Sequence, residues 1–93
     1  MEVRISENES KGRAYIGEAT KPDAEMTFSK AGDDKIIIDH TEVKELLKGQ
    51  GAGKQMLMAL VQMARGRNIK ILPLCPFAHA MFRKDPSIKD VWS

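Results

Sequence analysis

The sequence predicts an α/β fold whose sheet is mixed but mostly antiparallel, with one βαβ unit and a short C-terminal helix. Three observations carry this prediction: apolar residues that alternate with polar ones in the first third, an isoleucine run at 36–38, and a helical stripe that follows a glycine cluster at 49–53. Strands that precede a helix and one further apolar strand are typical of this class. At 93 residues the chain has the size of one domain, which we assign to residues 1–93.

The first third of the chain is predicted to form three strands. Val3 and Ile5 alternate with polar residues, and the second short run, residues 13–18, carries Tyr15 and Ile16 between Gly12 and Gly17. Residues 24–30 alternate apolar and polar side chains, which is the period of a strand with one buried face. The turn-forming residues 31–34 then join this strand to the next one in a hairpin.

The next strand is predicted over residues 35–43. Its run Ile36-Ile37-Ile38 is apolar on both faces, so we expect a central strand that is covered on each side. The polar end, Asp39-His40-Thr41-Glu42, projects from the core. Strand alternation places His40 and Glu42 on the same side.

A helix and a second interior strand follow. Apolar positions recur at spacings of three and four from Ala52 to about Arg65, which predicts an amphipathic helix that ends at Gly66 or Asn68. Residues 69–75 are strongly apolar and predict a strand, with Pro73 marking its end or a bulge. The βαβ unit therefore spans residues 36–75.

The C-terminal part is predicted to contain one short helix. Pro76 suits the first turn of a helix that continues to about Lys84. Asp85-Pro86 then ends it, and we expect residues 88–92 to be extended.

Composition excludes several classes of protein. The net charge is only +2, from 15 basic and 13 acidic residues, without the basic cluster that nucleic-acid binding requires. No apolar run is long enough to cross a membrane, and the N-terminus has no signal-peptide core. We therefore expect a cytoplasmic protein that binds neither membranes nor nucleic acids. Such a small core is only modestly stable, so a homodimer remains open.

The single cysteine, Cys75, is incompatible with an internal disulfide or a cysteine-rich metal site. We expect no bound metal.

The glycine cluster is the most informative motif. It consists of Lys48, Gly49, Gln50, Gly51, Ala52, Gly53 and Lys54. Backbone amides in such a turn, together with a helix N-terminus, form a site for an anion such as phosphate. A nucleotide-binding P-loop is excluded because Lys48 and Gln55 stand where that motif needs Gly and Ser or Thr. The dinucleotide pattern also fails, because Lys54 occupies its third glycine.

This cluster resembles the signature of the GCN5-related N-acetyltransferases, in which a Gln or Arg is followed after two residues by Gly and, two positions later, by Gly or Ala. Lys48, Gly51 and Gly53 stand at these positions, with Lys48 replacing the usual Gln or Arg. Residues 39–43 and 74–78 resemble the very short, single-domain subgroup of the superfamily. The resemblance covers about residues 24–92.

The resemblance implies a minimal acetyltransferase fold that uses acetyl-CoA as cosubstrate. Residues 48–54 would bind its pyrophosphate, and backbone groups of Glu42 and Val43 would meet the pantetheine and the acetyl carbonyl. The reaction implied is acetyl transfer to an amine, on a small molecule or a peptide, that the sequence does not identify. The chain has no room for the helices with which larger relatives hold that acceptor.

Three residues are candidates for the chemistry. His40 is the best general base because imidazole titrates nearest neutral pH, and Glu42 would orient it or share a water. A histidine bonded to backbone is the alternative. Cys75 would act as a nucleophile, as a proton donor to the leaving thiolate, or as a small packed side chain. Two other functions stay open: a non-catalytic module that binds CoA or acyl-CoA, and a thiol sensor acting through Cys75.

Overall fold

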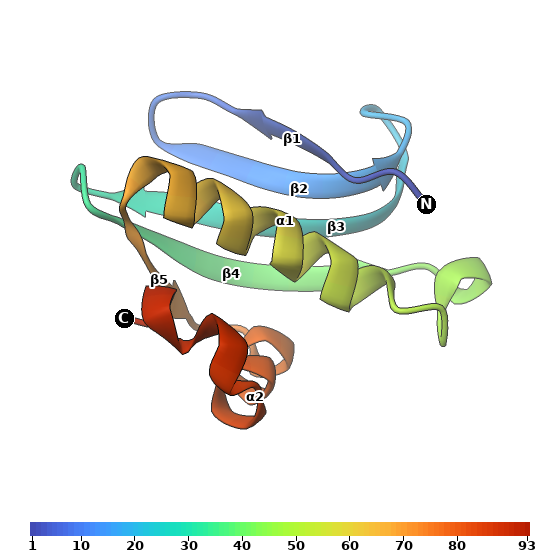
Figure 1. Cartoon of the computed structure of the whole chain (residues 1–93). Coiled ribbons are helices and arrows are strands. Elements are labelled where there is room, and N and C mark those ends of the chain that lie inside the picture. The colour runs from blue at the N-terminus through green and yellow to red at the C-terminus, as the bar shows by residue number, and fades with distance from the viewer.

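A single five-stranded sheet forms the centre of the computed structural model, which describes residues 1–93 (Figure 1). Its strands lie in chain order, and every neighbouring pair is antiparallel except the parallel pair β4–β5 that α1 connects. The predicted α/β class and its one βαβ unit are therefore confirmed. The elements are β1 (Arg4–Glu7), β2 (Lys11–Gly17), β3 (Pro22–Ala31), β4 (Lys35–Val43), η1 (Glu45–Leu47), α1 (Ala52–Arg67), β5 (Lys70–Pro73), α2 (Pro76–Lys84) and η2 (Pro86–Val91).

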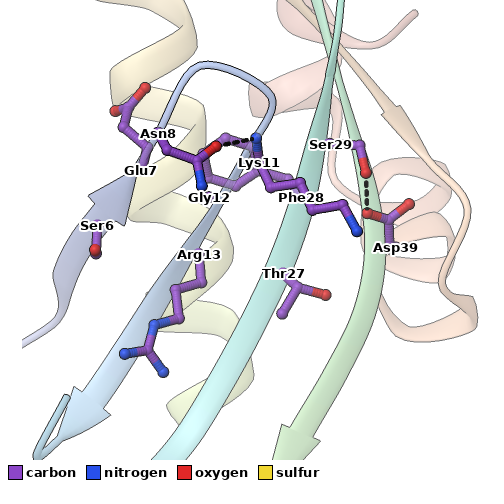
Figure 2. A pocket seen from close by; sticks show the side chains of 10 residues that line it. All are labelled: Ser6, Glu7, Asn8, Lys11, Gly12, Arg13, Thr27, Phe28, Ser29 and Asp39. Carbon is purple, nitrogen blue, oxygen red and sulfur yellow. Dashed lines mark hydrogen bonds between the residues drawn. The ribbon is translucent and has the colours of Figure 1, made fainter. Parts of the chain in front are cut away.

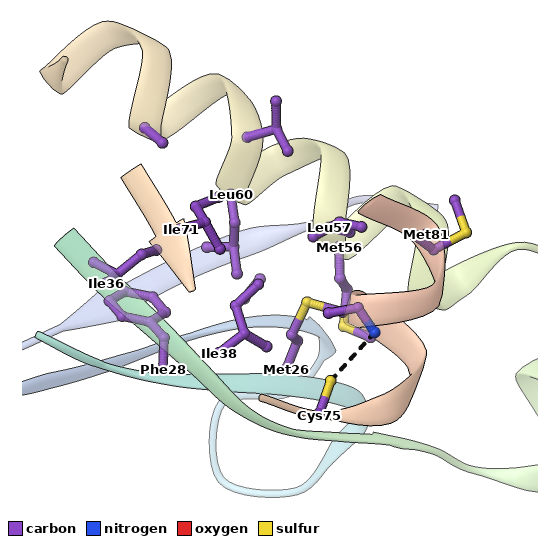
Figure 3. Packing of buried hydrophobic residues seen from close by; sticks show 14 of the residues in the cluster. Met26, Phe28, Ile36, Ile38, Met56, Leu57, Leu60, Ile71, Cys75 and Met81 are labelled. Atoms are coloured by element: carbon purple, nitrogen blue, oxygen red, sulfur yellow. Dashed lines mark hydrogen bonds between the residues drawn. The ribbon is translucent and has the colours of Figure 1, made fainter. Parts of the chain in front are cut away.

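The core lies on one face of the sheet. One cluster of 20 buried residues joins the strands to α1, α2 and η2, so both α-helices cover the same face. Figure 3 shows Met26 and Ile38 of the sheet packed near Leu57 of α1. The expectation that β4 is covered on each side is wrong: Ile36 and Ile38 are buried, whereas Ile37 points to the other face and is only half-buried. We call this other face the open face.

A bulge in β4 changes which residues face the core. Phe28 of β3 is opposite Ile38, but Thr27 is opposite His40, so Asp39 has no partner across the strand pair. An extra residue in one strand reverses the side-chain alternation beyond it. Thr41 therefore lies on the core side, opposite the buried Met26, and His40 and Glu42 lie on the open face.

The strands β4 and β5 separate just before this bulge. Their parallel pairing ends at Ile38 and Pro73, so β5 is shorter than the predicted strand over 69–75. The amides of Leu74 and Cys75 both donate to the carbonyl of Ile38, at 3.0 and 3.2 Å, and the chain then turns into α2. As a result, the last residues of β4 have no strand beside them on this side.

Local signals end α1 and shape the C-terminal segment. Asn68, in the left-handed region at φ 56°, caps α1 through its amide and the carbonyl of Ala64, so the helix ends there rather than at Gly66. The expectation of an extended tail over 88–92 is wrong for most of its length. Asp85 accepts a hydrogen bond from the amide of Ser87 at 2.9 Å and starts η2. None of the helices has the length and apolar character that a membrane crossing demands.

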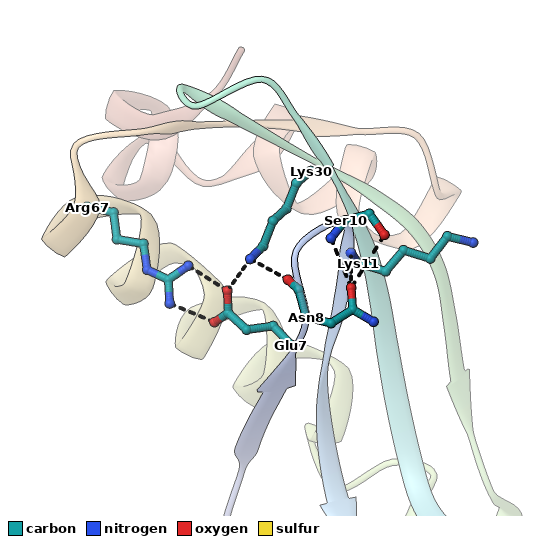
Figure 4. Close-up of polar contacts among 6 residues, drawn as sticks. All are labelled: Glu7, Asn8, Ser10, Lys11, Lys30 and Arg67. Atoms are coloured by element: carbon teal, nitrogen blue, oxygen red, sulfur yellow. Dashed lines mark hydrogen bonds and ion pairs between the residues drawn. The ribbon is translucent and has the colours of Figure 1, made fainter.

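Glu7 ties together three elements that are distant in sequence. Its carboxylate accepts hydrogen bonds from Arg67 at the end of α1, at 2.9 and 2.6 Å, and pairs with Lys30 of β3 at 2.7 Å (Figure 4). These hydrogen bonds, that from Arg67 foremost, lower the pKa of Glu7 from 4.5 to about 2. Lys30 also donates to the carbonyl of Asn8 at 2.7 Å, so the same network holds the β1–β2 turn.

We predict that Glu7→Gln lowers the free energy of unfolding by about 1 kcal/mol at neutral pH, the size expected for a partly exposed ion-pair network. Because the folded state lowers the pKa of Glu7, its contribution is complete above pH 4.5 and disappears as the pH falls through about 2. Urea denaturation across this range should show the wild-type and variant curves converging towards acid. Glu9→Gln is the matched control, since Glu9 is exposed and forms no ion pair. A constant difference at every pH would refute the assignment.

Candidate functional site

A groove of about 560 Å³ lies where the end of β4, the glycine cluster and α2 meet. Its lining residues are Thr41, Glu42, Val43, Leu47, Lys48, Gly49, Gly51, Ala52, Gly53, Lys54, Phe77 and Met81. The structure thus brings together every residue that the sequence predicted for cofactor binding except Gln50. The side chain of Gln50 instead donates to the carbonyl of Leu46 at 2.9 Å.

The glycine cluster presents several free backbone donors at the start of α1. Gly49 and Gly51 have φ values of 79° and 78°, in the left-handed region that favours glycine, and a Cβ at either position would meet nothing within 4 Å. Five amides of the cluster donate to no other backbone group or side chain. They belong to Gly49, Gly51, Ala52, Gly53 and Lys54. Because they lie at the start of α1, where the helix dipole is positive, the arrangement can bind an anion.

Two lysines add positive charge beside these amides. The ammonium group of Lys48 lies 3.2 Å from Glu45, and both side chains are largely exposed. The charge of Lys54 reaches Asp85: the pKa of Asp85 is lowered chiefly by hydrogen bonds from Ser87 and to a smaller extent by this lysine. Lys54, in the first turn of α1, therefore lies near the end of α2.

Phe77 forms an apolar wall of the groove and was not predicted as a site residue. A Cβ added at Gly53 would lie 2.7 Å from the Cζ atom of Phe77, so the phenyl ring occupies the space that a larger residue at 53 would need. This contact joins the first turn of α1 to the first turn of α2. The sequence gives no local signal for it, because the two residues meet only through the βαβ topology.

The candidate base is placed outside the groove. His40 and Glu42 form a pair on the open face, with Nε2 of the histidine 3.7 Å from a carboxylate oxygen, and their side chains are 67% and 75% exposed. Glu42 also lines the groove, at the end of β4, but His40 does not.

Cys75 is buried beside the point where β4 and β5 separate. It is 4% exposed and caps α2, with Sγ accepting a hydrogen bond from the amide of Ala78 at 3.4 Å. The same sulfur lies 3.1 Å from the hydroxyl of Thr41, so one side-chain contact bridges the separated strands. Cys75 itself does not line the groove. Thr41, which does, was not predicted as a site residue.

A second hollow, of about 690 Å³, crosses the open face from the β1–β2 turn to Asp39 (Figure 2). Three of its charged side chains already have partners within the chain: Glu7 pairs with Arg67 and Lys30, Arg13 pairs with Glu25, and Asp39 accepts a hydrogen bond from Ser29 at 2.6 Å. It lies on strands, away from the start of α1 whose free amides distinguish the first groove. No group of three or more His, Cys, Asp or Glu residues is arranged to hold a metal ion.

Comparison with known proteins gives one family throughout. The family model for GCN5-related N-acetyl-transferases matches residues 13–91. A GCN5-like candidate N-acetyltransferase from Staphylococcus aureus is 41% identical, with a TM-score of 0.76 over 97% of this chain and 87% of that chain. No curated protein matches.

Two more distant structures share the fold. The ribosomal-protein-alanine N-acetyltransferase from Brucella melitensis biovar Abortus 2308 has a TM-score of 0.65 at 15% identity, over 81% of this chain and 62% of that one. Nourseothricin acetyltransferase has a TM-score of 0.53 at 21% identity, over 78% of this chain and 46% of that one.

We predict that the effect of Gly53→Ala on the free energy of unfolding depends on the side chain at position 77. Alanine favours a helix over glycine by up to about 1 kcal/mol, but at position 53 its methyl group collides with the phenyl ring. Gly53→Ala should therefore be neutral or destabilising in the wild type and stabilising in a Phe77→Ala background, as measured by urea denaturation. Gly66→Ala is the control, because a Cβ there meets nothing within 4 Å and should stabilise both backgrounds equally. Equal effects of Gly53→Ala in both backgrounds would contradict the contact.

Proposed function

Because the chain belongs to the GCN5-related N-acetyltransferase family, we propose that it binds acetyl-CoA in the groove beside the glycine cluster and transfers the acetyl group to an amine. The observation that carries this proposal is the set of five free amides at the start of α1. A pyrophosphate presents several acceptor oxygens and two negative charges, so it matches both the number of these donors and the sign of the helix dipole.

Side chains of the cluster have a secondary part in this binding. Lys48 and Lys54 supply long-range attraction for phosphate groups, but Lys48 is exposed and paired with Glu45, so its contribution is small. Leu47, Phe77 and Met81 give the groove an apolar side against which the pantetheine arm would pack. Lys48 in place of the usual Gln or Arg is compatible with this arrangement because the backbone makes the main contacts.

The end of β4 would hold the reactive end of the donor. Acetyl-CoA supplies a thioester, which is an activated acyl group. Glu42 and Val43 line the groove, and their backbone groups would orient its carbonyl and polarise it. These residues are available for that role because β5 has already turned away from β4 at Ile38.

His40 would accept the proton from the incoming amine, and Glu42 would orient the imidazole or share a water with it. The pair lies on the open face, whereas the groove lies on the helix-covered side of β4. An acceptor on the open face would therefore meet the acetyl group where β4 and β5 separate. A general base must come within hydrogen-bond reach of the proton that it removes, and this approach satisfies that requirement.

Cys75 would serve this site mainly by position. Its thiol caps α2 and contacts Thr41, so it links the start of α2 to the end of β4 beside the groove. A nucleophilic or redox role would require this thiol to leave both contacts. Titration with acetyl-CoA and, separately, with CoA disulfide, each followed by intact-mass analysis, separates the roles. An acetyl adduct from acetyl-CoA indicates a nucleophile, a CoA adduct formed by exchange with CoA disulfide, which releases one CoA thiol, indicates a thiol sensor, and an unmodified chain in both titrations supports the capping role.

Gly51→Val should weaken acetyl-CoA binding by about tenfold or more in calorimetry. A β-branched side chain is strained at φ 78° and would project into the space that the pyrophosphate needs. Gly32→Val is the matched control, since Gly32 also has a positive φ, 68°, but lies in the β3–β4 turn away from the groove. If both variants bind acetyl-CoA as the wild type does, the glycine cluster is not the donor site.

His40→Gln should lower kcat for amine acetylation by about a hundredfold, the scale of general-base catalysis, with little change in acetyl-CoA affinity. The assay follows release of the CoA thiol with a panel of small-molecule and peptide amines. His79→Gln is the control, because His79 is an exposed histidine of α2 that does not line the groove. Tight binding of acetyl-CoA without turnover of any amine would favour the non-catalytic binding module instead.

A further inference from the structure

The two edges of the sheet differ in whether another segment of the chain covers them. At the β5 edge, Trp92 forms a bridge with Ile71, and the amide of Ser93 donates to the carbonyl of Ile71 at 2.8 Å. The C-terminal segment therefore covers that edge. At the opposite edge, β1 pairs only with β2, and all four of its residues are exposed (Figure 1). An uncovered edge strand is a template for pairing with another chain.

The residues along the β1 edge alternate in character. Val3 and Ile5 lie on the helix-covered side: Val3 packs against the core, and Ile5 is opposite the buried Ala14. Met1 and Ile5 are exposed apolar residues, at 49% and 38%. Glu2 and Arg4 share the other side, where they form an exposed ion pair at 3.5 Å. The edge thus carries an apolar row and a row of two opposite charges.

We propose that residues 1–5, the first two residues of β1 and the segment that precedes them, pair antiparallel with the same residues of a second copy of this chain, with Val3 opposite Val3 of the partner subunit. In this register Glu2 faces Arg4 of the partner subunit, and the symmetry axis repeats that ion pair. Met1 then faces Ile5 of the partner subunit, so two exposed apolar side chains cover each other. This inference is independent of the proposed function.

Neighbouring registers lack this complementarity. Centring the axis on Arg4 would place two arginines directly opposite each other, which is destabilising across strands. Centring it on Ile5 would place Arg4 opposite Ser6 and Val3 opposite Glu7, without any opposite-charge pair. Only the register centred on Val3 places opposite charges across from each other and apolar side chains across from each other.

The dimer would continue one sheet across the two-fold axis. Two strands of this length bury less than the roughly 800 Å² per partner of a standard interface. The association is therefore weak and reversible, with a dissociation constant in the micromolar range or above. Because the interface is small, this constant depends strongly on the two symmetry-related ion pairs.

Charge reversal tests this register directly. Glu2→Arg and Arg4→Glu each turn both cross-strand ion pairs into like-charge pairs, so each variant alone should self-associate at least about tenfold more weakly than the wild type. An equimolar mixture of the two variants restores opposite charges at both pairs and should dimerise again. Sedimentation equilibrium at protein concentrations up to millimolar measures the self-association of each variant and the association in their mixture. Lys84→Glu, an exposed reversal on α2, should leave association unchanged.

A crosslink supplies a second measurement that does not depend on charge. Val3→Cys places two cysteines opposite each other on the axis and should yield a disulfide-linked dimer with oxidised glutathione, whereas Ser6→Cys, which has no equivalent opposite it, should not. A wild-type protein that stays monomeric at millimolar concentration overturns the proposal. So does a dimer that neither reversal weakens, because its interface then lies elsewhere.

Discussion

The separation of β4 from β5 at Ile38 is the constraint on which the rest of the site depends. One carbonyl, that of Ile38, accepts from both Leu74 and Cys75, which ends the parallel ladder and starts α2. Meanwhile β4 continues beside β3 to Val43. The end of β4 is therefore held rigidly on one side and left accessible on the other. A groove forms there because β5 ends earlier than β4, and the β4–α1 connection and α2 line the rest of it.

The bulge at Asp39 gives this accessible strand end two chemically different sides. Thr41 faces the core and meets Cys75, while His40 and Glu42 face the open side. Without the extra residue, His40 would point towards the hydrophobic core, where an uncompensated polar ring is costly. The bulge thus keeps polar residues in solvent and, in the same step, puts the candidate base and the candidate donor groove on opposite sides of one strand.

Sequence reasoning succeeded where the signal is local. The glycine cluster was identifiable because Gly49 and Gly51 are needed for left-handed backbone conformations, and the helix stripe of α1 follows a simple period. It failed where partners from elsewhere in the chain decide the outcome. Ile37 is as apolar as its neighbours, and only the one-sided placement of α1 and α2 leaves it half-buried. The bulge at Asp39 likewise depends on register with β3. The start of η2, by contrast, had a readable signal in Asp85-Pro86-Ser87, an N-cap followed by proline.

The proposed recognition through backbone amides would explain how the motif tolerates variation in its side chains. Lys48 is exposed and already paired with Glu45, so its replacement for Gln or Arg changes little of the groove. What cannot vary freely is backbone shape: Gly51 must stay left-handed, and Gly53 must leave room for Phe77. Three local features therefore define the groove: the left-handed Gly51, the small Gly53 and the early end of β5. They act through chain geometry, so a domain of 93 residues can build it without enlarging its core.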